Sequence, residues 1–331
     1  APNKIQLGPK LTRGLGAGGL PTVGESAAEE STKELANMLQ GADMVFLTAG
    51  MGGGTGTGSI PIAAKVAKAC GAVTIGIVTK PFSFELGRRQ TNAKTGIEKL
   101  SEYCDTLIVI PNDKLLEIAP RDLPLEMAFT LADDVLRQGV QGISELITET
   151  GLINVDFSHI KSIMTRGGGA LMSIGTGEGP NKVHQAVEKA LHHPLLDDID
   201  LYSASGIIAN FTGSQDMSFK DVTDALKTLQ AATGGHAEVI PGIITDDRMN
   251  DRVQLILIVT GIGAQKTGFS QTGSGNQSIP ETPKQEAPDP APKAADEPQP
   301  INEIGLDNYR TQSDPTDNLS IPAFLRRRAR K

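Results

Sequence analysis

The chain has 331 residues, of which 38% are hydrophobic and 21% charged, which is enough for two globular domains that each bury a core. A formal charge of −8 and a pI near 5.2 argue against a specific nucleic-acid partner, because such a protein needs cations clustered on one face. Two cysteines outside any CxxC pattern argue against a disulfide scaffold or a zinc ribbon, and no run of residues is long and apolar enough for a transmembrane segment. We therefore expect a cytoplasmic protein.

Buried strands and helices alternate in the first part of the chain. "DMVFLTA" (43–49), "AVTIGIVTK" (72–80) and "DTLIVIP" (105–111) predict strands. "IPIAAKVAKAC" predicts a helix that has Pro61 in its first turn and ends at Gly71, and a second helix is expected over roughly 87–103. Strand, helix and strand in this order predict an α/β domain with a parallel sheet.

A long helical pattern follows, from about Leu123 to Ile147, and its length favours a helix that joins two domains. Its apolar stripe is Phe129, Leu136, Val140, Ile143 and Ile147. Beyond it, "GALMSIG", "GIIANFT", "AEVIPGI" and "VQLILIVTG" predict strands, with helices near 181–192 and 218–232. These elements predict a second, smaller α/β domain.

The composition then changes. Eight of the twenty prolines fall between Pro280 and Pro315, which predicts a disordered linker. At its end "LSIPAFLRRRARK" combines apolar residues with five cations among the last six positions. This pattern favours a tethered recognition peptide, and a frayed tail is the alternative. The predicted parts are a first α/β domain (1–122), a central helix (123–149), a C-terminal domain (150–264), a linker (265–316) and a tail peptide (317–331).

The stretch "GMGGGTGTGS" from Gly50 to Ser59 predicts a loop that binds phosphate. It does not contain the GxGxxG of dinucleotide-binding folds, and Ser59 stands where a P-loop has its lysine. What remains is a glycine-rich backbone whose N–H groups can point at an anion, ahead of the positive end of a helix dipole. The alternative is a glycine-rich turn without a ligand.

Several motifs, in this order, resemble the tubulin and FtsZ superfamily and, more closely, the FtsZ family of bacterial cell-division proteins. They are "LTRGLGAGGLPTVG", "GADMVFLTAGMGGGTGTG", "TKPFSFE", "TLIVIPNDKLLEI", "VLRQGVQGISELIT", "GLINVDF" and "IPAFLRRR". The resemblance implies a filament protein that binds GTP or GDP, with Mg²⁺ held mainly by the phosphates. It also implies that a strand, a first phosphate loop and a first helix of this family are absent ahead of residue 1.

The resemblance assigns nucleotide-binding roles to four segments. The phosphate loop would be Gly52, Gly53, Gly54, Thr55, Gly56, Thr57 and Gly58, with Gly16, Ala17, Gly18 and Gly19 sensing the terminal phosphate. Glu85 and Arg89 would contact the ribose, although Leu86 replaces a usual glycine. Phe129 would stack on guanine, and Asp133 would accept hydrogen bonds from it. Without the resemblance, Phe129 would be assigned to the core and Asp133 to a solvated face.

By the same resemblance, the loop "GLINVDFSHIKSIM" would enter the nucleotide pocket of the next subunit. Asn154, Asp156 and His159 would be its catalytic residues, and His159 stands where the family has a second acid. An imidazole ordinarily titrates near pH ~6.5, so it can serve as a base at neutral pH but supplies no negative charge. The local alternative is that Asp156 caps a helix beginning at Phe157, with His159 in its first turn facing solvent.

These observations favour a GTP-hydrolysing, self-assembling protein of the division ring at mid-cell. The alternative is a scaffold of the same fold with little or no hydrolysis, and a metabolic enzyme is disfavoured because no nucleophile, base and orienting group come together. The tail residues Ile321, Pro322, Phe324, Leu325 and Arg326 would bind a membrane-tethering protein such as FtsA or ZipA. In the sequence, no carboxylate or cysteine stands at metal-ligand spacing from His184, His192 and His193, so we expect no protein metal site.

Overall fold

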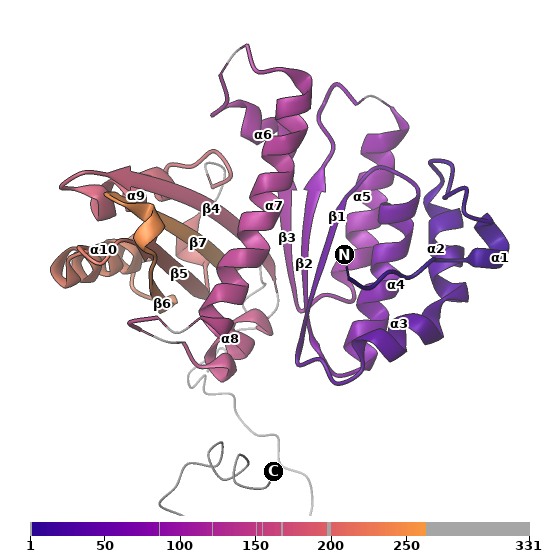
Figure 1. Cartoon of the computed structure of the whole chain (residues 1–331), viewed down its shortest axis with the longest axis horizontal. Coiled ribbons are helices and arrows are strands. Elements are labelled where there is room, and N and C mark those ends of the chain that lie inside the picture. Colours follow the sequence, from indigo (N-terminus) through magenta and orange to yellow (C-terminus); the bar gives the residue numbers. More distant parts are fainter. Residues whose placement is uncertain are drawn as a thin grey trace, which may run out of the picture. The chain divides into compact units, whose positions relative to one another are not determined.

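The computed structural model describes residues 2–262, except 86, 121, 150, 154, 167 and 197–199 (Figure 1). Seven strands form one sheet in the order β1-β2-β3-β4-β7-β5-β6. They are β1 Met44–Gly50, β2 Val73–Lys80, β3 Thr106–Pro111, β4 Gly169–Glu178, β5 Gly206–Gly213, β6 Glu238–Thr245 and β7 Arg252–Ile262. The α/β fold class is therefore as predicted.

Strands β1, β2, β3 and β4 run parallel, and β7 lies antiparallel to both β4 and β5. Among the described residues, the sheet register joins β3 to β4 at two residue pairs, Leu107 with Gly169 and Ile108 with Ala170. Periodicity predicted the strands but not this junction, because it carries no information on which strand ends meet. The predicted domain limits remain predictions.

Helix α7, Leu125–Thr148, lies between the strands of the two halves (Figure 1). Its buried face consists largely of small residues, including Ala128, Ala132, Gly139 and Gly142. A side chain at Gly139 would collide with Met172 of β4, and one at Gly142 with Ile256 of β7. The predicted stripe is therefore partly wrong: Ile143 is buried, but Phe129 is 40% exposed.

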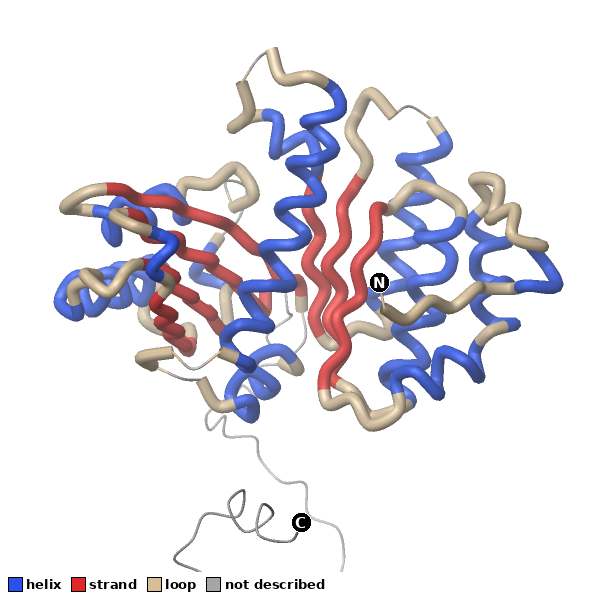
Figure 2. The backbone as a smooth tube through the Cα atoms, in the orientation of Figure 1, coloured by secondary structure: helices blue, strands red, loops and turns tan. Residues whose placement is uncertain are grey.

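The remaining helices cover the two halves (Figure 2). In the first half, α2 Pro21–Glu30 and α3 Thr32–Leu39 pack on α4 Thr55–Ala69, and α4 packs on α5 Arg88–Ser101. In the second half, α9 Lys182–Leu191 packs on β4 and β7, and α10 Phe219–Ala232 packs on α9 and β6. Shorter helices are α1 Pro9–Thr12, α6 Asn112–Leu116 and α8 Phe157–Met164, and two 3₁₀ turns cover Leu201–Ser203 and Asp247–Met249.

The predicted position of Pro61 is wrong. Helix α4 begins at Thr55 rather than after the glycine run, so Pro61 lies within the helix. Glycines at positions 56 and 58 lower helix propensity, but the Gly58 N–H already donates to the Gly54 carbonyl at 3.1 Å. The phosphate loop is therefore shorter than the sequence suggested.

The buried Lys182 links three segments of the second half through two ion pairs. The Lys182 side chain is 7% exposed, and its Nζ lies 2.9 Å from Oδ1 of Asp251 and 2.5 Å from Oδ2 of Asp216. Hydrogen bonding to Asp216 is the main cause that raises the pKa of Lys182, and the same bond lowers the pKa of Asp216. The start of α9 is thereby tied to the loops before α10 and β7.

Candidate nucleotide site

The glycine loop connects the carboxyl end of β1 to the first turn of α4. Gly52 has φ +110°, and a Cβ there would lie 3.0 Å from the Arg89 carbonyl oxygen, so a larger residue would be strained and crowded. The Thr57 hydroxyl accepts a hydrogen bond from the Gly52 N–H at 2.8 Å. Among the described residues, and apart from Gly53 itself and its chain neighbours, no atom lies within 4 Å of a Cβ built on Gly53. The loop is therefore fixed at Gly52 and open at Gly53, which suits the approach of an anion to the helix N-terminus.

The second predicted loop, 16–19, lies against the first. A Cβ on Gly54 would lie 2.7 Å from the Leu20 nitrogen and 2.9 Å from the Gly19 nitrogen. Asn92 of α5 joins the loops, because its Nδ2 donates to the carbonyls of Gly52 at 3.1 Å and Gly19 at 3.3 Å. Helix α2 starts directly after this second loop, so the amino-terminal turns of α2 and α4 adjoin each other and both favour a negative charge.

An aromatic cluster forms beside these loops. Phe82 and Phe84 follow β2 and stack at a centroid distance of 5.0 Å, and Phe129 meets Phe82 edge-on at 5.4 Å. Phe82 is fully buried, whereas Phe84 and Phe129 are 47% and 40% exposed. The structure thus places Phe129 on a rigid aromatic support with part of its ring open to a stacking partner.

Asp133 lies one turn after Phe129 on α7 and is exposed. Within the described part of the chain its carboxylate makes no hydrogen bond or ion pair. The adjacent Asp134 differs, because it pairs with Arg137 at 2.7 Å and accepts from Gln138. Asp133 therefore offers, next to the aromatic cluster, a carboxylate that has no hydrogen-bond or ion-pair partner among the described residues.

Glu85 and Arg89 form an ion pair, and Glu85 also accepts from the Phe82 N–H at 3.0 Å. The predicted ribose contacts thus hold each other at the start of α5, beside the aromatic cluster. Leu86, where the sequence departs from the family, lies outside the described residues.

Asn112, which follows the carboxyl end of β3, is a candidate that the sequence reasoning missed. It is 5% exposed, and its Oδ1 has no hydrogen-bond partner among the described residues. A buried acceptor without a partner is costly, so it points to a donor from a ligand. The signal in the sequence was an asparagine immediately after a predicted parallel strand, where ligands bind in α/β sheets.

The predicted catalytic loop lies at the other end of α7. Asp156 caps α8 as expected, since its side chain accepts from the Ser158 N–H at 2.9 Å, and His159 is exposed in the first turn. Hydrogen bonds from Ser158 lower the pKa of Asp156, and the nearby His159 adds a smaller effect. Asn154 lies outside the described residues. At 1.5 Å per residue, the helix between Phe129 and Thr148 is about 28 Å long, so these residues cannot meet the glycine loops of the same chain.

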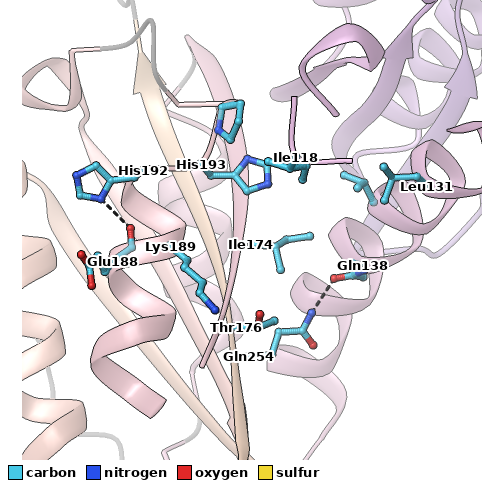
Figure 3. A pocket seen from close by; sticks show the side chains of 12 residues that line it. Ile118, Leu131, Gln138, Ile174, Thr176, Glu188, Lys189, His192, His193 and Gln254 are labelled. Carbon is cyan, nitrogen blue, oxygen red and sulfur yellow. Dashed lines mark hydrogen bonds between the residues drawn. The ribbon is translucent and has the colours of Figure 1, made fainter. Parts of the chain in front are cut away.

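A large cavity of about 860 Å³ lies elsewhere, between α7 and the second half (Figure 3). Its apolar lining includes Ile118, Leu131 and Ile174, and Gln254 donates to Gln138 at 2.7 Å at its edge. None of the predicted nucleotide residues lines it. His192 and His193 do, but the described residues contain no group of three or more metal-ligating side chains.

Comparison with known proteins agrees with this arrangement. Residues 1–120 match the Tubulin/FtsZ family, GTPase domain, and residues 168–263 match the FtsZ family, C-terminal domain. A mutant FtsZ from M. jannaschii is 44% identical, covers 77% of this chain and 76% of its own, and superimposes with a TM-score of 0.74. The chain belongs to the tubulin/FtsZ family.

Two further structures extend the comparison. An empty FtsZ dimer from M. jannaschii is 41% identical over 83% of this chain and 81% of its own, with a TM-score of 0.74. CetZ2 from Haloferax volcanii, in a GTPγS-bound protofilament, is 18% identical over 79% of each chain with a TM-score of 0.63, which shows the fold alone. This tubulin/FtsZ protein thus has the GTPase domain of a family of GTP-binding filament proteins.

The described residues fit a guanine nucleotide. The open backbone at Gly53 and the paired helix N-termini suit phosphate, and the Asp133 carboxylate, which has no partner among the described residues, suits the base. No helix among the described residues is long and apolar enough to cross a bilayer. The tail residues from Ile321 to Arg326 lie outside the described part, so their role remains a prediction.

Proposed function

We propose that this protein assembles head to tail with GTP and hydrolyses GTP between subunits in bacterial cell division. The observation that carries the proposal is the separation of two half-sites by α7. Nucleotide-binding groups gather at the start of that helix, and Asp156 and His159 lie beyond its end. A complete hydrolytic site therefore needs the second half-site of another copy.

Each half-site would contribute a distinct part of the reaction. The loops at Gly16 to Gly19 and Gly52 to Gly58 would hold the phosphates, with Mg²⁺ bound mainly by phosphate and water oxygens. Asp156 from the neighbouring subunit would orient the attacking water, which bonds to the terminal phosphorus as the bond to the bridging oxygen breaks. GDP and inorganic phosphate are the products.

A scaffold with little hydrolysis is the second candidate, and His159 is the observation that favours it. A neutral imidazole at this position supplies no negative charge beside the attacking water, and its protonated form repels Mg²⁺. We infer slow turnover rather than none, because Asp156 retains its carboxylate.

The location and partners follow from the same proposal. The chain would act in the cytoplasm at mid-cell, in a division ring. Its tail, through Ile321, Pro322, Phe324, Leu325 and Arg326, would dock on a tethering protein of the FtsA or ZipA kind.

The test combines sedimentation with phosphate release on the natural full-length protein and on Asp156→Asn. Asparagine caps a helix as well as aspartate does, so α8 should stay intact while the charge is lost. We expect GTP-dependent pelleting of both proteins and phosphate release at least about tenfold slower from the variant. If the wild-type protein pellets equally with GTP, GDP and no nucleotide, the proposal is wrong.

A further inference from the structure

The loop ahead of Asp156 lies along the outer edge of β6. The Leu152 N–H donates to the Ile243 carbonyl at 2.9 Å, and the Ile243 N–H donates to the Ile153 carbonyl at 3.5 Å, which makes an antiparallel bridge. Strand β6 is the last strand in the sheet order, so these backbone groups lie on its unpaired side. The bridge gives the loop a defined register on a rigid strand.

Gly151 makes this contact sterically possible, and a second glycine, Gly242, lets β6 itself pack against α7. A Cβ on Gly151 would lie 2.3 Å from the Ile243 carbonyl oxygen, far inside contact distance. A Cβ on Gly242 would lie 1.9 Å from Cδ2 of Leu146, in the last turns of α7. Because the obstruction at Gly151 is a backbone atom, a larger residue there must displace the loop from β6.

The other side of Asp156 is fixed as well. Asp156 caps α8, and Ile160, Ile163 and Met164 of that helix are buried in the main core. In contrast, Leu152 is 72% exposed, so packing of its side chain does not hold the loop in place. Asp156 and His159 are thus exposed at the start of α8. The bridge to β6 fixes the chain before them, and the buried face of α8 fixes the helix that carries them.

We propose that the edge of β6 positions Asp156 and His159 for the neighbouring subunit, with Gly151 as the positioning residue. This inference rests on the proposed function, since it concerns the same hydrolytic half-site. The bridge presets the loop before assembly, so that docking of two subunits places the water-orienting groups without a further rearrangement. Misplacement by about 1 Å lowers rates by about a hundredfold in positioned reactions, so the effect on turnover should be large.

The test compares the full-length wild type with Gly151→Ala and with Thr245→Ala, an exposed substitution at the end of β6 that leaves the bridge intact. We expect Gly151→Ala to bind GTP and sediment within about twofold of wild type, while phosphate release per pelleted subunit falls by about ten- to a hundredfold. Thr245→Ala should match wild type in all three measurements. Hydrogen exchange of the wild type provides a readout that needs no variant: the Leu152 amide should exchange at least about tenfold more slowly than an open loop amide.

The outcomes separate the two proposals. If Gly151→Ala turns over GTP at the wild-type rate in polymers of equal mass, or if the Leu152 amide exchanges freely, positioning by β6 is wrong and the proposed function stands. If the variant does not fold, the exchange rate of the Leu152 amide in the wild type tests the positioning proposal by itself: slow exchange supports it, and free exchange overturns it. A wild type that neither assembles nor releases phosphate with GTP overturns the proposed function, whatever the state of the bridge.

Discussion

Replacing Asp133 by alanine should remove the preference of this protein for guanine. The carboxylate is exposed on α7, one turn after Phe129, and makes no ion pair or hydrogen bond among the described residues. Guanine offers it two donors, the ring N–H and the exocyclic amine. Adenine offers no equivalent pair, so Asp133→Ala should affect GTP and leave the weak binding of ATP unchanged.

The expected loss can be worked out from these two bonds. A hydrogen bond to a charged group contributes about 1.5–3 kcal/mol, and exposure of Asp133 places both bonds at the lower end. The sum is about 3 kcal/mol, which corresponds to a loss of GTP affinity of about 150-fold. Inosine triphosphate lacks the exocyclic amine, so it should bind the wild type about tenfold more weakly than GTP does. In Asp133→Ala, inosine triphosphate and GTP should bind with the same affinity.

Asp134→Ala is the matched control. It removes the same charge from the next residue of the same helix, but Asp134 is engaged by Arg137 and Gln138. Equilibrium binding of fluorescent GTP, with competition by inosine triphosphate and ATP, should show no change for this control. An unchanged GTP dissociation constant in Asp133→Ala, or an equal loss in both variants, would refute the assignment of Asp133 to the base.

Three further predictions follow from other parts of the chain. His159→Asp should raise phosphate release above wild type, because a carboxylate supplies the negative charge that an imidazole lacks; equal rates would mean that Asp156 acts without a second group. Deleting residues 319–331 should leave sedimentation with GTP intact and abolish recruitment to a membrane-bound tethering partner, and recruitment that persists would place the contact elsewhere. Lys182→Met should lower the free energy of unfolding in urea by about 1–2 kcal/mol, against less than about 0.5 kcal/mol for the exposed Lys227→Ala. The lowered pKa of Asp216 adds stability above its ordinary pKa of about 3.8 that is lost as the pH falls, so wild type and Lys182→Met should converge in acid.

The sequence predicted those parts of the fold that repeat with a regular period. The predicted strands at 43–49, 72–80 and 105–111 shift by at most one residue in the structure, because buried β-branched runs end sharply at polar residues and glycine. Contacts between distant segments carry no such period. The small-residue face of α7, the β3–β4 junction and the α2 and α3 helices were therefore not predicted.

The site was predicted unevenly for a related reason. Glycine loops have a strong local pattern, and the structure brings the two predicted loops together through Asn92. Asn112 has no local pattern, because its significance lies in a buried oxygen that lacks a partner. Gly151 likewise has no local pattern, because its significance lies in the Ile243 carbonyl oxygen, which would be 2.3 Å from a Cβ at position 151.

The residues of both half-sites share a property: each makes a contact within its own chain that accounts for it structurally. Asp156 is accounted for as a helix cap, Glu85 by its pair with Arg89, and Phe129 by its aromatic neighbours. Each of these contacts is satisfied within one chain, so under the proposed function the monomer would hold the geometry of both half-sites without being able to perform the reaction. Since about 28 Å of α7 separates Phe129 from Thr148, the proposed chemistry would become available only when the end of one copy meets the start of the next. In the proposed function, hydrolysis would then be tied to assembly by the length of one helix.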